Sequence, residues 1–268
     1  MRPTIAMMTG STGGPCSAMV LAAGRGERMR PLTDTCPKPL LRVRGKPLMQ
    51  WAIEALAQGG VRDILVNTDW LGDQIEACFS DPSIVSAKSL QRQAAGALAD
   101  RPVRFAFSRE GQDFGGALET AGGITRALPH LADPFWLLAG DIFAPEFRFS
   151  EQQRAAFGTN DALAHIWLVP NPSHNPKGDF ALSPQGLVCN DGPLRYTYST
   201  IGLFRHALFA PPYCTIAPGN PQGTRAALAP LLRLAAQQDR LSAALYTGPW
   251  TDVGTPERLA QLQLPSAF

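Results

Sequence analysis

The sequence predicts an α/β fold, in which a mainly parallel β-sheet is flanked by helices, and three observations predict it. Short continuous apolar runs recur through the first half of the chain, as expected for strands that are buried on both faces. Segments with the i, i+3, i+4 apolar spacing of helices separate these runs. A glycine-rich turn follows the first run, which is typical of the ligand-binding edge of such sheets. Strands that alternate with helices favour a parallel sheet.

The first half of the chain is predicted to hold four strands and three helices. The strands are expected at residues 18–23, 63–68, 103–108 and 135–141, and the helices at 46–60, 72–79 and 119–131. Pro47 suits the first turn of the first helix, and Gly59-Gly60 suits its exit. The polar, alanine-rich residues 81–100 are expected to form an excursion or a surface helix.

The second half is less regular. Strands are expected at residues 162–171, 179–183, 186–190, 198–204 and 241–248, helices at 224–239 and 255–263, and a long surface loop at 211–223. Thr255 is placed as the N-cap of the last helix, with Pro256 at its first position. The predicted architecture is therefore a Rossmann-like, mixed but mainly parallel sheet with a small inserted lobe that forms a pocket.

Composition limits the class of protein. The 268 residues suffice for one large domain with its own core, and the net charge of +2 is too small to indicate binding to nucleic acid or to an acidic membrane surface. The five cysteines are scattered and never form a C-x-x-C pair, which favours reduced thiols in a cytoplasmic protein. No apolar run approaches the roughly 18 residues of a membrane span.

Residues 1–17 are expected to form a flexible leader. Gly, Ser, Thr and Pro dominate this stretch, and it lacks the apolar region of a signal peptide. Residues 18–268 are then expected to form a single domain, with one half at about 18–145 and the other at about 146–268.

The turn after the first strand reads Gly24-Arg25-Gly26-Glu27-Arg28-Met29. It is not a dinucleotide fingerprint, because methionine stands where the third glycine belongs, and the chain has no Walker A motif. Backbone N–H groups in such a turn can approach an anion closely. With Arg28, Arg30 and Lys38 nearby, they would suit a polyphosphate.

A solvated charged face is the alternative interpretation of these cations. Pro37 and Pro39 restrict the backbone on both sides of Lys38, and this restriction would serve no purpose for a lysine that is merely solvated. The spacing therefore favours binding of phosphate.

The same stretch resembles a known signature. "LAAGRGERMRPLTDTCPKPLLRVRGKPL" is similar to the motif of the sugar-1-phosphate nucleotidyltransferases. Three further blocks, "LETAGGI", "NPSHNPKGDF" and "WTDVGTPERL", resemble a narrower group of that family, the bacterial uridylyltransferases that act on N-acetylmuramate 1-phosphate in cell wall recycling. The resemblance runs from Ala18 to the C-terminus and is weak at residues 81–100 and 211–223.

The resemblance implies a reaction in which a sugar 1-phosphate attacks the α-phosphorus of a nucleoside triphosphate and pyrophosphate leaves. The substrate brings its own nucleophile, so catalysis reduces to positioning and charge stabilisation. By position in the motif, Arg28 would hold the departing phosphates, and Lys38 would lie between the α-phosphate and the sugar phosphate. The implied nucleotide-binding residues, in the half at 18–145, are Ala23, Gly24, Gly26, Glu27, Arg28, Lys38, Thr120 and Gly122.

A triphosphate normally needs Mg²⁺, held by one or two carboxylates. Asp141 ends the fourth strand and Asp252 follows Trp250; each could be an ordinary turn residue, but both match metal ligands of the family. Relatives often have Asn-Gly-Asp at the first of these places, whereas this chain has Ala139-Gly140-Asp141, which leaves the identity of the sugar phosphate open.

The resemblance also implies a sugar site, mainly in the half at 146–268. Its expected residues there are Asn171, Gly178, Asp179 and Ser199, with Thr200 beside them, and Glu119 is expected to join them from the other half. A capped helix start and a tight inter-strand loop are the simpler interpretations of these blocks. Lys177 is a hypothetical partner for the lactyl carboxylate of a muramoyl group, and His174 is expected to be a loop residue rather than a catalyst.

The leading expectation is therefore transfer of a uridylyl group from UTP to N-acetylmuramate 1-phosphate, with Mg²⁺ as cofactor and with the protein possibly a monomer. Mannose-1-phosphate guanylyltransferase and glucose-1-phosphate thymidylyltransferase are the alternatives within the class. A non-catalytic nucleotide-sugar binding subunit is the alternative outside it. The sequence shows no hexapeptide repeats of a bifunctional acetyltransferase and no D-x-D motif of a sugar transferase.

Overall fold

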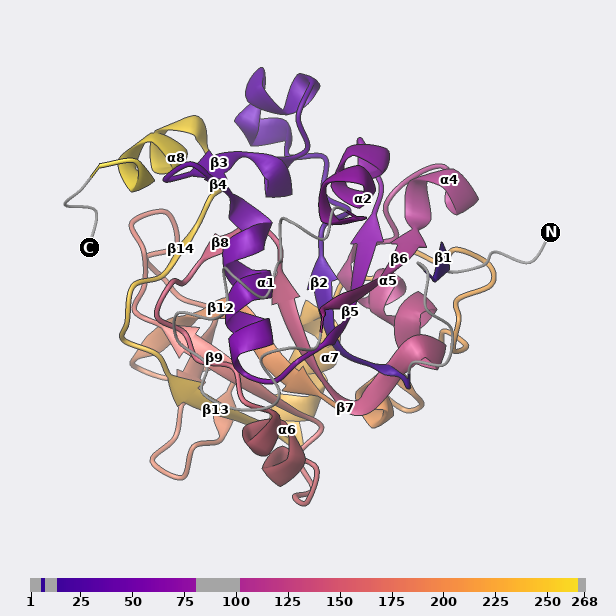
Figure 1. The fold of residues 1–268 in the computed structure, drawn as a ribbon. Helices are drawn as coiled ribbons and strands as arrows, with labels where there is room; N and C mark the ends of the chain where they lie inside the picture. Colours follow the sequence, from indigo (N-terminus) through magenta and orange to yellow (C-terminus); the bar gives the residue numbers. More distant parts are fainter. Residues whose placement is uncertain (1–5, 8–13, 81–101, 265–268) are drawn as a thin grey trace.

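The computed structural model describes residues 6–7, 14–80 and 102–264. Over these residues a ten-stranded mixed sheet runs through the molecule (Figure 1). Its centre is parallel and has the order β6 (Arg104–Arg109), β5 (Asp63–Thr68), β2 (Cys16–Leu21) and β7 (Leu131–Ala139). The predicted class, a mainly parallel mixed sheet with flanking helices, is confirmed.

The second half of the chain extends the sheet beyond β7. β12 (Arg195–Phe204) is antiparallel to β7, β9 (Ala164–Val169) is antiparallel to β12, and β13 (Leu241–Leu245) is parallel to β9. The first part of β12 also pairs with β10 (Phe180–Leu182), and β10 pairs with β11 (Val188–Cys189). These short strands form the inserted lobe.

Two small ladders lie beside the main sheet. β8 (Ile142–Phe143) pairs with β14 (Thr251–Asp252), which brings the C-terminal segment next to the end of β7. β3 (Arg42–Val43) pairs with β4 (Lys46–Pro47). α8 (Pro256–Leu262) follows β14, and the Thr255 hydroxyl accepts a hydrogen bond from the Arg258 N–H, so the predicted N-cap is confirmed.

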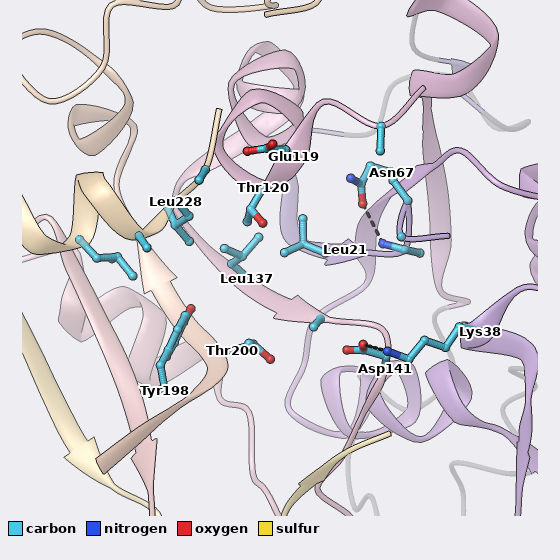
Figure 2. Close-up of a pocket in the computed structure, with 18 of the residues that line it drawn as sticks. Leu21, Lys38, Asn67, Glu119, Thr120, Leu137, Asp141, Tyr198, Thr200 and Leu228 are labelled. Atoms are coloured by element: carbon cyan, nitrogen blue, oxygen red, sulfur yellow. Dashed lines mark hydrogen bonds and ion pairs between the residues drawn. The ribbon is translucent and has the colours of Figure 1, made fainter. Parts of the chain in front are cut away.

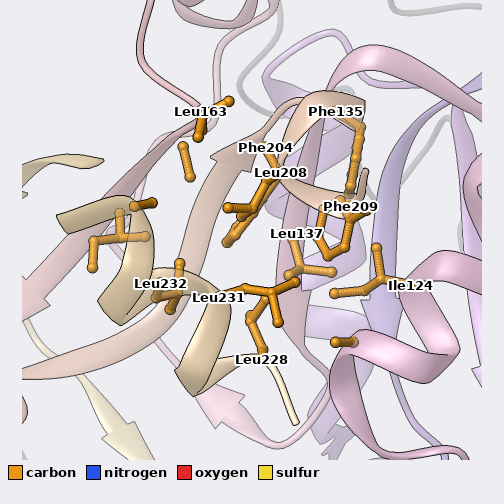
Figure 3. Close-up of a cluster of buried hydrophobic side chains, with 14 of the residues drawn as sticks. Ile124, Phe135, Leu137, Leu163, Phe204, Leu208, Phe209, Leu228, Leu231 and Leu232 are labelled. Atoms are coloured by element: carbon orange, nitrogen blue, oxygen red, sulfur yellow. The ribbon is translucent and has the colours of Figure 1, made fainter. Parts of the chain in front are cut away.

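Helices cover both faces of the sheet because successive strand residues point to opposite sides. On one face, Ala18 and Val20 of β2 pack with α1 (Leu48–Gln58) and α2 (Gly72–Ser80). On the other, Met19 packs with α5 (Glu119–Ala127) and α7 (Ala229–Gln237). Figure 3 shows Leu228, Leu231 and Leu232 of the α7 segment turned toward the buried rings beside β12.

A third, smaller apolar cluster anchors the turn after β2. Met29 is fully buried with Val43, Leu48, Phe143 and Val253. The methionine that breaks the dinucleotide fingerprint thus fixes the turn against β8 and the segment after β14. Three short 3-10 helices carry the chain through this region: η1 (Glu27–Met29), η2 (Leu32–Asp34) and η3 (Lys38–Leu40).

Several expectations need correction. β2 begins at Cys16, inside the expected leader, and β1 (Ala6–Met7) pairs with β6 at the sheet edge; leader residues 1–5 and 8–13 lie outside the described ones, as do residues 81–100. α4 (Glu110–Phe114) and α6 (Glu151–Phe157) were not predicted. α5 is shorter than predicted and continues as η4 (Leu128–His130), and η5 (His206–Phe209) follows β12.

The start of the predicted 224–239 helix is also wrong, because α7 begins at Ala229. The Ala226 backbone instead bonds to three residues at the start of α5: Ala226 N donates to Leu118 O, and Ala226 O accepts from Ala121 N and Gly122 N. The expected surface loop at 211–223 is partly buried, because the Asn220 side chain is fully enclosed and donates to Gly122 O.

Two negative findings concern the described part of the chain. None of the five cysteines, all within the described residues, is in a disulfide. None of the helices described is long and apolar enough to cross a membrane.

Candidate active site

A cavity of about 630 Å³ opens at the carboxyl ends of β2 and β7. These two strands are parallel neighbours, and Leu21 pairs with Ala139 at their ends. The order of the sheet reverses there, since the strands after β2 run one way across the sheet and β7 lies on the other side. Open α/β sheets bind their ligands at such a point.

The turn after β2 forms one side of the cavity through Ala22, Ala23, Gly24 and Gly26. Gly26 has a φ of +70°, and an added Cβ would lie 3.1 Å from the Thr33 methyl group and 3.3 Å from Lys38 Cβ. Glycine is therefore required there both for its backbone conformation and for the close approach of η3. The Thr33 hydroxyl donates to Gly26 O at 2.9 Å and closes the turn.

Lys38 and Asp141 face each other in the cavity, and Lys38 Nζ forms an ion pair with Asp141 Oδ2 (Figure 2). The lysine side chain is 12% exposed and the aspartate side chain 32%. The expected phosphate-binding lysine and the expected metal ligand thus share one place although 103 residues separate them in the chain.

The three arginines of the turn differ in what holds them. Arg25 donates to Thr33 O and Asp34 Oδ1 and stacks over the Trp70 ring, 3.8 Å from its centroid. Arg30 donates to the same Asp34 carboxylate at 2.8 Å. Arg28 is exposed and forms no hydrogen bond or ion pair with any residue that the structure describes. It is the arginine of the turn that is free to bind a ligand.

Asp252 lies beside Asp141 along the backbone, but its side chain is not among those that line the cavity. It is opposite Ile142 in the β14–β8 ladder, and Val253 N donates to Asp141 O at 2.9 Å. Its carboxylate is held by Arg258 and by His174, whose Nε2 lies 2.9 Å from Oδ1. Within the described residues, no group of three or more His, Cys, Asp or Glu side chains could hold a metal ion.

The lobe contributes Asp179, Phe180, Tyr198 and Thr200 to the cavity. The Asp179 carboxylate is oriented by two donors, Tyr198 N at 2.8 Å and Asn175 Nδ2 at 3.2 Å. Burial raises the pKa of Tyr198 far above its usual range, so its phenol stays protonated.

Two residues expected to contact the sugar make contacts within the lobe. Asn171 donates to Arg195 O at 2.9 Å and accepts from the Thr197 hydroxyl at 3.0 Å, which ties the loop to β12. A Cβ at Gly178 would lie 2.9 Å from the Tyr196 nitrogen, so this glycine allows approach to β12. Neither of them lines the cavity.

Ser199, also expected to contact the sugar, does not line the cavity, whereas its neighbour Thr200 does. Ser199 is fully buried, and its hydroxyl donates to Trp167 O at 2.7 Å. Tyr198 and Thr200 line the cavity from alternate positions of β12, and Ser199 between them does not (Figure 2).

Two cavity residues adopt a backbone conformation that disfavours side chains with a Cβ. Glu119 has a φ of +59° and Thr200 a φ of +62°. For a β-branched residue such as threonine, this is a genuine outlier that the surrounding structure must impose. Strain of this kind gathers at ligand sites, which supports assignment of this cavity as the functional one.

Asn67 and Glu110, which were not predicted as site residues, form a buried hydrogen-bonded pair in the cavity wall. Asn67 Oδ1 accepts from Ala22 N at 2.8 Å, and its Nδ2 donates to Glu110 Oε1 at 2.7 Å. Glu110 Oε2 accepts from Leu118 N at 2.8 Å. The pair therefore joins the turn after β2 to the start of α5. Burial raises the pKa of Glu110, despite these hydrogen bonds.

The structure thus brings part of the predicted set to one cavity. Its members are Ala23, Gly24, Gly26, Lys38, Glu119, Thr120, Asp141 and Asp179. Glu27 and Arg28 are exposed on the same turn but outside the cavity wall. Gly122 packs under the loop at Thr224, where an added Cβ would lie 2.5 Å from the carbonyl oxygen.

Fold and site together define an α/β protein that presents backbone amides, a lysine and free arginine charge at the switch point of its sheet, as proteins that bind nucleoside phosphates do. The chain belongs to the nucleotidyl transferase family, whose model matches residues 17–178.

Two relatives and one solved structure are similar to the chain over most of its length. The chain is 43% identical over 254 residues to an N-acetylmuramate alpha-1-phosphate uridylyltransferase of Neisseria meningitidis serogroup B, covering 92% of this chain and 96% of that protein. It is 30% identical to a protein of the same description from Caulobacter vibrioides, covering 91% and 93%. A solved structure described as a glucose-1-phosphate thymidylyltransferase of Bacillus anthracis shares the fold, with a TM-score of 0.67, 18% identity and coverage of 92% and 93%.

Proposed function

We propose that the chain transfers a uridylyl group from UTP to N-acetylmuramate 1-phosphate, releasing pyrophosphate and forming UDP-N-acetylmuramic acid. One observation carries this proposal: two relatives of that activity align over more than nine-tenths of both chains. The expected site of cell wall recycling is the cytoplasm. The cavity supports the proposal because its lining combines a phosphate-binding turn with a lobe of polar groups.

The chain's own residues would do little covalent chemistry. The sugar phosphate is already ionised, so the protein must align it with the α-phosphorus and stabilise charge on the leaving pyrophosphate. Backbone amides at Gly24 and Gly26 and the unpaired Arg28 are the groups proposed for the triphosphate. Lys38 would leave Asp141 and bridge the α-phosphate and the incoming sugar phosphate.

The other proposed contacts follow from the cavity lining. Thr120 and Glu119, at the start of α5, face the same space as the turn (Figure 2). They are proposed to contact the nucleotide and a sugar hydroxyl respectively. Asp179 and Thr200 are proposed for the sugar, because both line the cavity from the lobe.

Mg²⁺ is proposed as the cofactor, held by Asp141 and Asp252, and it would neutralise phosphate charge when bound. Two carboxylates completed by substrate phosphates form a donor set that suits this ion. The charge of the cavity supports the proposal. Its acidic residues (Glu110, Glu119, Asp141 and Asp179) outnumber its two basic ones, so an anionic substrate needs an added cation.

The proposed function is tested by measuring pyrophosphate release with UTP, dTTP and GTP, each paired with the 1-phosphates of N-acetylmuramate, N-acetylglucosamine, glucose and mannose. Turnover confined to UTP with N-acetylmuramate 1-phosphate is the expected result. A preference for another pair would mean that a different nucleotide or sugar phosphate is the substrate. No turnover with any pair would favour a non-catalytic binding subunit.

The metal proposal has its own test. Asp141→Asn is expected to abolish the dependence of turnover on added Mg²⁺ and to lower kcat by about 100-fold or more. Asp191→Asn, at a side chain that is 96% exposed, is the matched control and should behave as wild type. Wild-type metal dependence in Asp141→Asn would remove this residue from the metal site.

A further inference from the structure

The proposed substrate carries a group that separates it from related sugars. N-acetylmuramate bears a lactyl ether whose carboxylate is ionised at neutral pH, whereas N-acetylglucosamine has a hydroxyl there. A carboxylate that enters a cavity already rich in acidic side chains loses water and meets like charge, so it requires a cation beside it.

Two cationic side chains line the cavity in the described part of the chain, Lys38 and Arg233. Lys38 is paired with Asp141 and is committed to phosphate in the proposed reaction. Arg233 is exposed at the cavity wall, and its guanidinium forms no ion pair with the acidic residues that the structure describes.

The Arg233 side chain stacks on an aromatic ring, and the backbone of Arg233 is hydrogen-bonded to the lobe. Its guanidinium carbon lies 5.1 Å from the centroid of the Phe180 ring, which also lines the cavity. Its backbone carbonyl accepts a hydrogen bond from Asn190 Nδ2 at 2.9 Å, which ties α7 to the residue after β11. A guanidinium stacked on a ring keeps its donors free at the edge, and their planar fork matches a carboxylate.

The contact with Phe180 of β10 places this arginine on the lobe side of the cavity. In Figure 2, Leu228, at the start of α7, and Tyr198, from the lobe, lie on the side opposite to Lys38 and Asp141. A sugar that keeps its phosphate beside Lys38 would extend its ring toward the lobe. The expected rival, Lys177, is exposed and does not line the cavity.

We propose that Arg233 binds the lactyl carboxylate of the sugar phosphate and thereby determines the preference of the enzyme for muramate over glucosamine substrates. The inference rests on the proposed function and names the specificity-determining residue of the same site. It assigns no role in the transfer step to Arg233.

The test compares N-acetylmuramate 1-phosphate with its lactyl methyl ester, which keeps the shape of the substrate and removes the charge. In the wild-type enzyme, esterification should raise KM by about 10- to 100-fold. In Arg233→Ala, KM for the acid should rise by a similar factor, and the acid and the ester should become equivalent. Arg233→Lys should keep part of the discrimination, because it keeps the charge and loses the fork.

Lys177→Ala is the charge-matched control and should discriminate acid from ester as wild type does. Thermal unfolding of each variant reports whether it is folded. Full acid-over-ester discrimination in Arg233→Ala, or its loss in Lys177→Ala alone, would overturn the inference and leave the proposed function standing. A wild-type enzyme that does not turn over N-acetylmuramate 1-phosphate would overturn both.

Discussion

Lys38 and Asp141 form an ion pair in the cavity, and each is proposed to exchange that partner for a substrate or a metal ion. The ion pair orients the two expected functional groups toward each other. Because the aspartate side chain is about a third exposed, the ion pair adds little to stability, about 0–1 kcal/mol. Its value lies in positioning.

Lys38→Met is therefore expected to lower kcat by about 100- to 1,000-fold while the thermal midpoint changes little. Steady-state rates and thermal unfolding of the same preparation check both parts. Lys46→Met is a suitable control, since Lys46 is also paired with a carboxylate, that of Glu54, and does not line the cavity. If the two variants lose the same fraction of kcat, Lys38 has no special role.

Arg28 and Arg30 provide a second matched comparison on one turn. Arg28 has no partner among the described residues, whereas Arg30 is bonded to Asp34. Arg28→Ala should lower kcat/KM for UTP by about 10- to 100-fold, the range of one charge-assisted contact, and Arg30→Ala by much less. Equal losses in the two variants would mean that the charge of the turn matters as a whole and that Arg28 holds no phosphate individually.

At the scale of elements, the strands that carry the site were the easiest to predict. The strand at 63–68 is observed with the predicted bounds, because a short apolar run bounded by turn residues favours a buried strand over a helix. The predicted start of α7 was wrong because the alanine-rich residues before it are hydrogen-bonded to the start of α5 through Ala226. These tertiary contacts outweigh helix propensity. α6 did carry a signal, Ser150 followed by Glu151, which is typical of a helix N-terminus.

Pairs formed across the fold could not be predicted from spacing. Asn67 and Glu110 are 43 residues apart, and nothing local in the sequence indicates that they share a hydrogen bond. Thr200 lines the cavity and Ser199 does not, because successive strand residues point to opposite faces and Thr200 shares the face of Tyr198. Lys38 was predicted as a phosphate-binding residue from its flanking prolines and the nearby glycine-rich turn, whereas the metal role expected of Asp141 came from the resemblance.

His165, in β9, makes the outer part of the sheet sensitive to acid. Burial lowers its pKa from 6.5 to about 4, and its Nδ1 lies 2.9 Å from the Ser242 hydroxyl of β13. The unfolded chain takes up a proton below pH 6.5 that the folded chain does not accept until about pH 4. The free energy of unfolding should therefore decrease as the pH is lowered from about 6.5 to about 4, and His165 should account for about 2–3 kcal/mol of this loss.

Denaturant titrations of wild type and His165→Gln at several pH values between 4 and 7 check this expectation. The variant should lose less stability than wild type as the pH falls, because its side chain does not titrate. Parallel pH curves for the two proteins would show that His165 carries none of the acid sensitivity.

Across the whole molecule, the sheet brings distant parts of the chain to one edge. The turn after β2, the end of β7, the start of α5, the lobe and α7 all face one cavity, with lining residues from Leu21 to Arg233. The C-terminal β14 and α8 return beside β8 and place Asp252 next to the backbone of Asp141. The proposed reaction needs these parts together, since no single segment holds the phosphates, the metal ligands and the sugar.

In the proposed reaction, the sugar phosphate attacks the α-phosphorus of UTP. To test this attack, the protein is incubated with Mg²⁺, N-acetylmuramate 1-phosphate and UTP labelled at the α-phosphorus, and the products are separated. All transferred label is expected in UDP-N-acetylmuramic acid, and the released pyrophosphate is expected to be unlabelled. Label in pyrophosphate or inorganic phosphate, or UTP left intact beside the sugar phosphate, would contradict the proposed reaction.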